Sequence, residues 1–519
     1  MMIMTKQPHK FLASLMAILM VAIVPMSCND SLDEPLERQV LVEDTDYTQS
    51  ENMYQLLTGA YELLYALQWE TFPIVSVRGD DVNAAGDQFP LTETDEFRYD
   101  RSFWMYNSSW LNFYDDIIKF HAAMEELELY KEFAPNPSEA DQYIAEIKVM
   151  RAFEMLQLTK LWGGVLIPTS SQTAELYTTP VSPREDVLQH ISDQMDEALD
   201  FLPNVRPNQR SDVRGGISRF TALAVKAQAN LELKDFQKVA DATGEIISSG
   251  AFNLDADFYE LFKIPGKLSN ENLLELQYSD FGQSSGENEA YLHAFFGPNN
   301  WTPAVAGSSG GWGFWEPSLK FIKFMLDRGE TVRLETSVLF TRQGIELIQS
   351  DPAYATLPAF VSNTTRDGDI IGRTDNEPNP RAIFSSGKHY LPSNQLTPGR
   401  TAYGTNKNFI VIRYAEVLLM HAEALTNGAN SAAMTADQAV NEVRSRAGLA
   451  PLNGVTLDNV LDEKFAEFGM EWGVRFYDLV RYDRTSELNH DGRTYSADDR
   501  FIPYPLAQID ILPQLGNNN

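Results

Sequence analysis

The sequence predicts a mainly α-helical protein whose helices are arranged in pairs and carry large irregular loops. Three observations support this fold class. Apolar residues recur at three- and four-residue steps through most of residues 48–250, which is typical of amphipathic helices. Alanine-rich segments separated by tight breaks indicate closely packed helical pairs. Between residues 265 and 408 the helical period is mostly absent, and Gly, Pro, Asn, Ser and aromatic residues dominate.

The N-terminus is typical of an exported protein. A basic start is followed by an apolar run over residues 11–26, then by Ser27 and Cys28, the only cysteine. A single thiol in an exported protein has no intramolecular disulfide partner, so we expect lipid attachment at Cys28. The alternative is an uncleaved membrane anchor, although the run is shorter than the ~20 apolar residues that a span needs. The pattern predicts a lipoprotein signal peptide over residues 1–27 and an acidic tether over residues 28–47.

Residues 48–519 are predicted to form one unit, because no linker rich in Pro, Gly or Ser divides them. Its N-terminal helical part spans residues 48–250, and a loop-rich part with C-terminal helices spans residues 251–519. Residues 69–101 lose the helical period and are interpreted as an ordered surface loop. The helices are expected, in order, at residues 48–67, 103–131, 138–162, 187–201, 218–233, 236–249, 317–326, 343–349, 413–426 and 435–446.

The clearest helical pair covers residues 218–249. Four alanines between Ala222 and Ala229 allow close approach of two helices, and Lys234 and Asp235 form a tight break. This arrangement is similar to a tetratricopeptide unit, which has a period of about 34 residues. A second alanine-spaced pair covers residues 413–446. A generic helical bundle is the alternative interpretation of the same residues.

The charge excludes one class of partner. The chain carries a formal charge of −32, and removal of residues 1–27, which hold two lysines and no acid, would make it −34. Nucleic-acid binding requires clustered basic residues, so nucleic acid is not an expected partner. An acidic surface is also the simplest route to solubility.

No known catalytic motif is present. The sequence has no nucleophile elbow, no zinc-binding helix motif, no phosphate loop and no Cys/His metal spacing. Asp255 with Asp257, and Asp367 with Asp369, could supply oxygen ligands to calcium, but neither pair has the spacing of a calcium-binding loop. We therefore expect no enzyme activity, no cofactor and no metal.

The strongest candidate for a binding site is aromatic. Residues 301–315 place Trp301, Trp312 and Trp315 among glycines, in a segment that cannot form a regular helix. Exposed indole rings can pack against the C–H faces of sugar rings, and polar side chains can bind the hydroxyls. The polar residues expected to contribute are Arg78, Asp80, Asp81 and Asn83. The alternative is that the tryptophans seal the loop onto the helices as core residues.

Several motifs in a fixed order resemble the SusD/RagB family over essentially the whole mature chain. They are SCNDSLD (27–33), RAF (151–153), LWGGV (161–165), RYAEVLLMHAEA (413–424), AVNEVRSRAGL (439–449), EWGVRFYDLVR (471–481) and PYP (503–505). We interpret the helical motifs as structural, with Arg413, Glu416 and Glu423 able to pair with Arg444, Arg475 or Asp478.

The resemblance implies a SusD-like scaffold of about four tetratricopeptide-like units with ligand-binding loops. It implies a non-catalytic lipoprotein on the outer face of the outer membrane, anchored through its N-terminal lipid. Such a protein would capture oligosaccharide or polysaccharide and act as the lid of a SusC-like TonB-dependent importer. In the family, ligand residues lie in the two regions that correspond to these loops. The resemblance therefore implies the same seven ligand residues: Arg78, Asp80, Asp81, Asn83, Trp301, Trp312 and Trp315. The alternative function is an oligopeptide-capturing lid of a RagA-like importer.

Overall fold

A computed structural model describes residues 46–283, 290–299, 301–303, 311–372, 383–399 and 404–518. The chain divides into residues 1–49 and a second unit, residues 50–519. Of the first unit only residues 46–49 are described, where the Asp46 carboxylate accepts a hydrogen bond from the Thr48 amide. The predicted signal peptide and Cys28 lie outside the described residues. Within the described ranges, no helix combines the length and hydropathy needed to cross a membrane.

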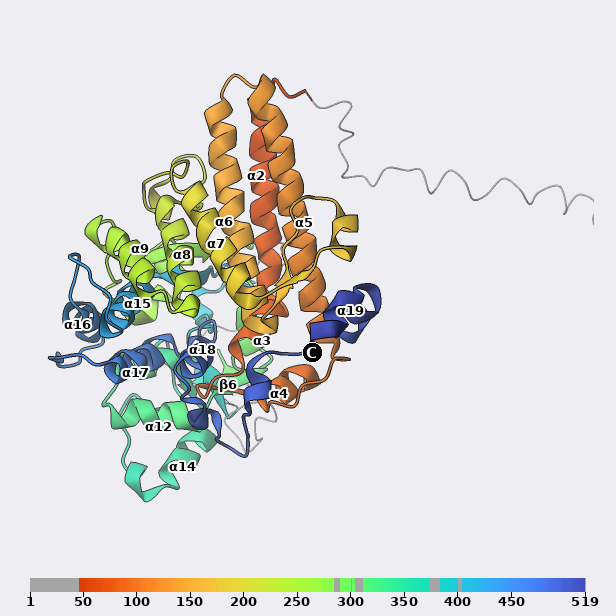
Figure 1. Cartoon of the computed structure of the whole chain (residues 1–519). Helices are drawn as coiled ribbons and strands as arrows, with labels where there is room; N and C mark the ends of the chain where they lie inside the picture. Colours follow the sequence, from red (N-terminus) through yellow and green to blue (C-terminus); the bar gives the residue numbers. More distant parts are fainter. Residues whose placement is uncertain are drawn as a thin grey trace, which may run out of the picture. The chain divides into compact units, whose positions relative to one another are not determined.

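A row of helices forms the scaffold (Figure 1). The members of this row are, in order, α2 (Ser50–Leu63), α5 (Trp104–Phe133), α6 (Pro137–Trp162), α7 (Arg184–Ala198), α8 (Arg219–Leu233), α9 (Phe236–Ser248), α15 (Tyr414–Thr426) and α16 (Ala436–Arg446). Each packs on the next, and α2 packs on both α5 and α6. Helix α15 packs directly on α9, although most of the loop-rich region separates the two in sequence. The predicted mainly α-helical, tetratricopeptide-like fold is confirmed, because consecutive antiparallel pairs build one continuous helical layer.

Local sequence explains how the α8–α9 pair forms. Ser218 makes a capping box with Thr221 at the start of α8. Lys234 then adopts a left-handed conformation (φ 59°) that ends α8, and the Asp235 carboxylate accepts from the Lys238 amide to begin α9. The predicted break at Lys234 and Asp235 is therefore the helix–helix turn.

Small and polar residues allow α9 and α15 to pack closely. A methyl group added at Gly244 would lie 3.1 Å from Ser431 Oγ. His421 on α15 bonds Thr243 Oγ1 through Nδ1 at 2.8 Å and the Met434 carbonyl through Nε2 at 3.2 Å. These contacts join the predicted C-terminal pair to the N-terminal pairs, so the two alanine-rich segments belong to one scaffold.

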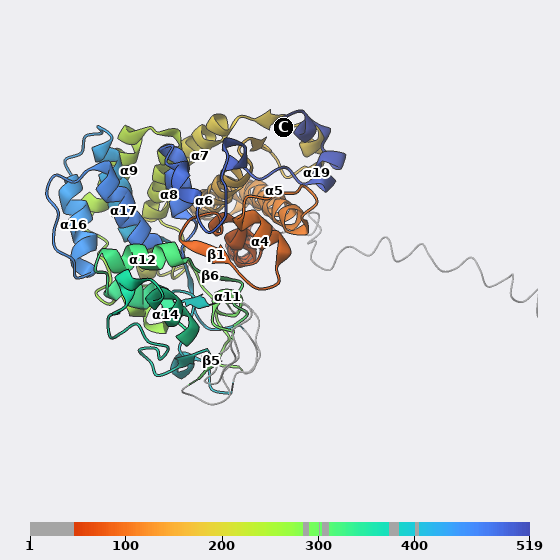
Figure 2. The same ribbon diagram turned by 90° about the horizontal axis from the view of Figure 1, so that it is seen from below.

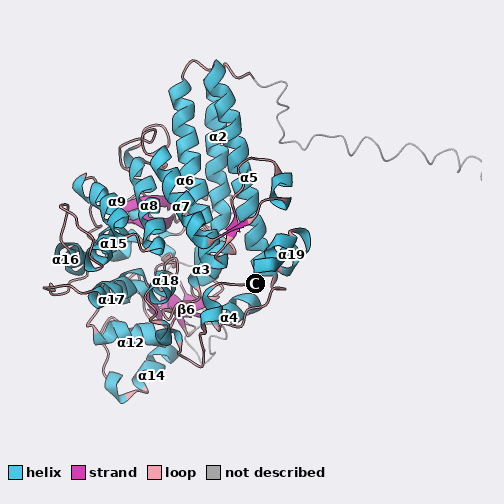
Figure 3. Ribbon diagram, viewed as in Figure 1, coloured by secondary structure: helices cyan, strands magenta, loops and turns pink. Residues whose placement is uncertain are grey.

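Shorter elements cover one end of this scaffold (Figure 3). The helices are α3 (Thr71–Ser76), α4 (Phe89–Asp95), α10 (Phe258–Leu261), α11 (Leu292–Phe296), α12 (Leu319–Asp327), α13 (Val332–Ser337), α14 (Arg342–Gln349), α17 (Leu457–Phe468), α18 (Val474–Arg481) and α19 (Leu506–Ile511), with the short 3-10 helix η2 (Leu64–Gln68) after α2. Of these, α12 and α14 match the helices expected near residues 317–326 and 343–349.

The described strands form two-stranded antiparallel ladders that join distant segments. The pairs are β1 (Val82–Ala84) with β6 (Trp315–Pro317), β2 (Val165–Leu166) with β3 (Val181–Ser182), β4 (Asn272–Leu276) with β10 (Phe409–Arg413), β5 (Trp301–Thr302) with β8 (Ile370–Ile371) and β7 (Val338–Phe340) with β9 (Phe384–Ser386). The β1–β6 pair holds the predicted polar loop against the tryptophan-rich segment, so it brings the two candidate ligand-binding regions together.

Residues 69–101 differ from the prediction of a surface loop. Their first part forms α3, β1 and α4, and the apolar side chains of Phe72, Ile74 and Val75 are fully buried. Helix α3 has only six residues, so it is too short to show a helical period. Residues 71–82 of this segment are therefore part of the core, whereas residues after β1, such as Asp87 and Phe89, are exposed.

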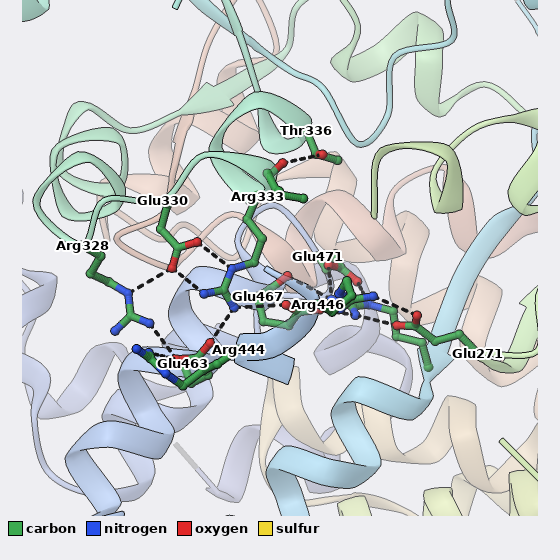
Figure 4. Close-up of polar contacts among 12 residues, drawn as sticks. Glu271, Arg328, Glu330, Arg333, Thr336, Arg444, Arg446, Glu463, Glu467 and Glu471 are labelled. Atoms are coloured by element: carbon green, nitrogen blue, oxygen red, sulfur yellow. Dashed lines mark hydrogen bonds and ion pairs between the residues drawn. The ribbon is translucent and has the colours of Figure 1, made fainter. Parts of the chain in front are cut away.

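A buried ion network ties α13, α17 and the β4–β10 ladder together (Figure 4). Arg333 contacts Glu463 at 2.7 Å and Glu467 at 3.2 Å, and Arg413 contacts Glu271 at 3.0 Å and Glu467 at 2.5 Å. Burial alone would raise the pKa of Glu467, but Arg446, Arg413 and Arg333 outweigh burial and lower it. Each buried charge in this network therefore has an opposite partner.

The partners within this network differ from those expected. Arg413 pairs with three glutamates, and Glu423 pairs with Lys464 at 2.7 Å and Arg481 at 2.8 Å. Glu416 accepts a hydrogen bond from Gln228 at 2.7 Å. The interpretation that these family motifs are structural holds, but their partners come from elements that the helical period does not predict, above all α17.

Candidate ligand-binding site

Three of the four predicted polar ligand residues are buried. Arg78 has no exposed surface: it donates to Tyr477 OH at 3.2 Å and to the Arg500 carbonyl at 3.0 Å, and its guanidinium lies 4.2 Å from the Phe476 ring centroid. Asp80 is also fully buried and accepts from Arg475 Nε at 2.8 Å. These side chains face the protein interior, so the prediction that they lie at an open surface is wrong.

Asp81 and Asn83 belong to the same segment but differ in how far they are buried. Asp81 is buried, and its Oδ2 accepts from the Met470 amide at 2.9 Å, while Oδ1 has no hydrogen-bond partner among the described residues. Burial raises the pKa of Asp81 to about 7. Asn83 is half-buried, and its Oδ1 accepts from Arg493 Nη2 at 2.5 Å. Of the four predicted polar residues, only Asn83 has a side chain that a ligand can reach.

The three tryptophans also separate into two groups. Trp315 is fully buried, with its ring centroid 4.3 Å from that of Phe296 and 5.4 Å from that of Phe72. Trp301 is 9% exposed and packs in a small core cluster with Tyr390. Trp301 and Trp315 are therefore core residues that seal the loop onto the helices, as the alternative interpretation predicts. Trp312 is half-buried, so its ring is partly open to solvent.

Trp312 is part of a larger group of rings, which we call the aromatic row. It consists of Trp69, Tyr291, Phe295, Trp312 and Phe314. The ring centroids of Trp69 and Tyr291 lie 4.8 Å apart, those of Trp69 and Phe295 5.0 Å, those of Phe295 and Trp312 5.3 Å, and those of Trp312 and Phe314 5.5 Å. All except the buried Phe295 are half-buried, so the row presents several ring surfaces at one face of the protein.

Backbone hydrogen bonds fix the row along α11. The amide of Phe314 donates to the Phe295 carbonyl at 2.7 Å, the Trp312 amide donates to the Ala294 carbonyl, and the Ala85 amide donates to the Phe314 carbonyl at 2.7 Å. The segment leading to β6 thus lies between α11 and the residues after β1 (Figure 2). Trp312 and Phe314 are half-buried and Trp315 is buried, and Gly313 between them has a positive φ of 60° that turns the chain before β6.

Two glycines are required for this close approach. A methyl group at Gly311 would lie 2.6 Å from the carbonyl oxygens of Gly297 and His293. A methyl group at Gly86 would lie 3.1 Å from the Phe314 ring, and Gly86 has a positive φ of 79°. Gly311 therefore allows the residues before β6 to pack against α11, and Gly86 allows the loop after β1 to approach the Phe314 ring.

Polar side chains border the row on the loop after β1. Asp87 is exposed and Gln88 is half-buried, and both follow Gly86 directly. Glu70, which follows Trp69, is half-buried, and burial raises its pKa. Ring faces next to amide and carboxyl groups are the combination that binds the C–H patches and hydroxyls of a sugar.

Sequence reasoning found Trp312 but missed Trp69, Tyr291 and Phe314. The glycines that flank Trp312 were a usable signal, because they indicate a segment without a helical stripe on which aromatic rings could be buried. Trp69 and Tyr291 gave no such signal, because their proximity arises only in the folded chain.

The acid pairs considered for calcium have structural partners. Asp257 caps α10 by accepting from the Tyr259 amide at 3.0 Å. Asp369 accepts from the Ser393 amide at 2.9 Å and from Ser393 Oγ at 2.5 Å. Within the described ranges, no three His, Cys, Asp or Glu residues are grouped so that they could hold a metal ion.

Comparison with known proteins agrees with this architecture. The sequence model of the SusD family matches residues 270–502. A SusD-like protein from Bacteroides ovatus is 22% identical, and the match covers 94% of this chain and 86% of that protein. The chain is thus similar to the SusD/RagB family, by its family model over residues 270–502 and by this relative over most of its length.

Solved structures show the same fold for this chain. Surface glycan-binding protein A from Bacteroides fluxus superposes with a TM-score of 0.73 at 22% identity, covering 89% of this chain and 97% of that structure. Surface glycan-binding protein A from Bacteroides thetaiotaomicron, in complex with laminarihexaose, superposes with a TM-score of 0.71 at 20% identity, covering 90% and 98%.

Proposed function

We propose that this protein is a non-catalytic glycan-binding protein of the cell surface and that it binds oligosaccharide or polysaccharide at the aromatic row. The observation that carries the proposal is the set of half-buried rings of Trp69, Tyr291, Trp312 and Phe314, fixed by backbone hydrogen bonds at one face. Rings that are already ordered lose little conformational entropy when a ligand stacks on them. Solved relatives described as glycan-binding, one of them with laminarihexaose, support the ligand class.

The proposed cellular role has two further parts. Lipid attachment at Cys28 would hold the protein on the outer face of the outer membrane, and the tether of residues 28–47 would let it reach a partner. The partner would be a SusC-like TonB-dependent importer, on which this protein acts as a lid. The lipoprotein-like N-terminus and similarity to the SusD/RagB family support both parts.

We expect binding of modest strength, because the row is a surface feature and a sugar is well hydrated. Dissociation constants in the micromolar to millimolar range correspond to about −4 to −8 kcal/mol. Loss of one stacking ring should remove about 1 kcal/mol or somewhat more. Such affinities suit capture followed by release to an importer.

The test is calorimetry and affinity electrophoresis over a panel of neutral oligosaccharides and polysaccharides that includes laminarihexaose. Trp312→Ala and Trp69→Ala should each weaken binding of the ligand that the wild type retains by about fivefold or more. Tyr177→Ala is the matched control, because Tyr177 is 60% exposed and takes no part in the row. Unchanged affinity in both row variants would place the site elsewhere.

The same protein samples test the alternatives. Retention of oligopeptides with no retention of any glycan would favour the peptide-capturing lid. Release of shortened products from labelled glycans by the wild type would contradict a non-catalytic role. For the anchor, Cys28→Ala should shift the protein from the membrane fraction to the soluble fraction, and an unchanged distribution would contradict lipid attachment.

A further inference from the structure

A cavity away from the aromatic row is lined by residues of α7, α8 and α18, and we call it the cation pocket. Figure 1 labels these three helices. Its volume is about 270 Å³. The basic residues that line it are Lys160, Arg184, Lys234, Arg481 and Arg500. The acids that line it are Glu185, Glu232 and Asp483. An excess of basic side chains is unusual in a chain whose formal charge is −32.

One acid pairs with both buried arginines. Glu232 Oε1 contacts Arg481 at 2.5 Å, and Glu232 also pairs with Arg184 through Oε2. In the described part of the chain, the side chains of Lys160, Lys234 and Arg500 have neither an ion pair nor a hydrogen bond. Glu185 lies 3.8 Å from Arg184, and Arg481 also pairs with Glu423 and Asp478, which do not line the pocket. Among the described lining residues, Lys160, Lys234 and Arg500 therefore face one acid without an ion pair, Asp483, which is exposed.

Several donors in the pocket have no acceptor. Arg184 Nε and Arg481 Nε are buried and have no hydrogen-bond partner among the described residues. Lys160 Nζ lies 4.7 Å from the Tyr477 ring centroid, and burial lowers the pKa of this lysine. A buried donor without an acceptor destabilises the folded protein, so an oxygen-rich ligand would gain by satisfying these groups.

Aromatic rings form the remaining wall. Phe476, Tyr477 and Phe501 line the pocket, and the Arg500 guanidinium lies 5.1 Å from the Phe501 ring centroid. Arg78 lies behind Phe476 and Tyr477 and fixes both rings from the interior. Phe476 and Tyr477 are buried and Phe501 is half-buried, so a ring-shaped ligand could pack against Phe501 while its charged group reaches the cations.

We propose that the cation pocket binds the anionic group of a small ring-shaped ligand, that is, a carboxylate, sulfate or phosphate carried on one sugar-sized ring. Cations without ion pairs, buried donors without acceptors and the half-buried Phe501 ring all favour this chemistry. The pocket is slightly smaller than the ~300–1,000 Å³ of sites for drug-sized ligands, which suits one ring rather than a chain. It shares no residue with the aromatic row.

The test is isothermal titration calorimetry at constant ionic strength with D-glucuronate, glucose 6-sulfate and glucose 6-phosphate, and with D-glucose as the neutral probe. We expect at least one of the anions to bind and glucose not to bind. Which anion binds identifies the group as a carboxylate, a sulfate or a phosphate. Binding of none of the three would overturn the proposal, and so would equal binding of glucose.

Two variants locate the site. Lys160→Met and Arg500→Ser should each weaken anion binding by about tenfold, as expected for loss of a charge-assisted contact. Arg500 is exposed, so its variant should fold normally even if Lys160→Met does not. Arg342→Ser is the control, because Arg342 is an exposed arginine on α14 and does not line the pocket. Anion binding that both pocket variants retain would overturn the assignment.

The outcome is independent of the proposed glycan site. Trp312→Ala should leave anion binding unchanged, and Arg500→Ser should leave binding of neutral glycan unchanged. Loss of anion binding in Trp312→Ala would contradict a separate pocket.

Discussion

Arg475 on α18 donates a hydrogen bond from Nε to Asp80 Oδ1 over 2.8 Å, although 395 positions separate the two residues. Lys320 Nζ lies 2.5 Å from the other oxygen of the same carboxylate. Asp80 therefore joins the segment before β1 to α12 and α18. This position explains why a residue that has the chemistry of a sugar ligand is instead part of the frame that supports the aromatic row.

For Asp80→Asn we expect a loss of stability and no loss of ligand affinity. The substitution leaves Arg475 and Lys320 without their shared carboxylate, and breaking a buried pair destabilises proteins by about 3–5 kcal/mol. Urea denaturation followed by circular dichroism measures this change, and calorimetry on the folded variant measures affinity. Asp115→Asn, at an exposed site on α5 away from the row, is the control and should stay within about 0.5 kcal/mol of wild type. A stable Asp80→Asn protein with lost glycan binding would restore the ligand role.

Trp315→Ala and Trp312→Ala should separate structural from binding tryptophans. Trp315 is fully buried against Phe72 and Phe296, so its removal leaves a large cavity and should decrease the free energy of unfolding by about 3–5 kcal/mol. Trp312 is half-buried, and its removal should decrease stability by about 1 kcal/mol. Thermal and urea denaturation compare the two variants directly. Equal losses would show that both rings have the same role.

Asp81→Asn should stabilise the protein at high pH. Burial raises the pKa of Asp81 from its ordinary 3.8 to about 7 in the folded state, with Asp80 adding to the increase and Arg475 opposing it. The folded state then binds the proton more tightly than the unfolded state, so stability falls as pH rises from about 4 to about 7. The asparagine variant lacks this fall and should be more stable by about 1–3 kcal/mol at pH 8.

At pH 4 the same variant should match the wild type, because Asp81 is protonated in the folded protein there. Denaturation curves at the two pH values supply the comparison. If the variant were less stable than wild type at pH 8, the charged form of the Asp81 carboxylate would contribute to stability. This would contradict the prediction, because Asp81 Oδ1 is buried and has no hydrogen-bond partner among the described residues.

Glu467→Gln should weaken the buried network most strongly near neutral pH. Glu467 contacts Arg333, Arg413 and Arg446, and its folded pKa lies below the unfolded value. Its stabilisation is therefore present above the unfolded pKa of about 4.5 and is lost as pH falls below it. We expect the variant to lose about 3–5 kcal/mol at pH 7 and less at pH 3.

The control for Glu467→Gln is Asp115→Asn, which removes the exposed pair with Lys119, 2.5 Å apart. Exposed pairs of this kind contribute about 0–1 kcal/mol, so this variant should have nearly wild-type stability. Similar losses in the two variants, measured by urea denaturation at pH 7, would show that burial of the network has no energetic importance.

The scaffold was largely predictable because its helices are long. Helices α5, α6, α8, α9, α15 and α16 each begin and end within a few residues of the ranges expected from apolar period, glycine stops and alanine spacing. Helices α3, α17 and α18 were not predicted. Helix α3 is too short to show a period, and α17 carries buried charges such as Glu463 and Glu467, which a hydrophobic pattern scores as surface.

The site was predictable only in part, because burial of its polar residues depends on distant partners. Arg78 is buried by Phe476 and Tyr477, and Asp81 is held by the Met470 amide, all nearly 400 positions away in sequence. Trp315 differs from Trp312 because Trp315 lies in β6, which pairs with β1, whereas Trp312 precedes the turn at Gly313. Neither fact can be obtained from the local composition.

The rings of the aromatic row and the charges of the buried network have no residue in common. The proposed ligand-binding residues and the residues of the buried network therefore occupy different positions of the chain. Under the proposed function, substitutions at Trp69, Tyr291 or Phe314 could change which glycan a descendant protein binds. The arginines and glutamates that stabilise the fold could stay the same.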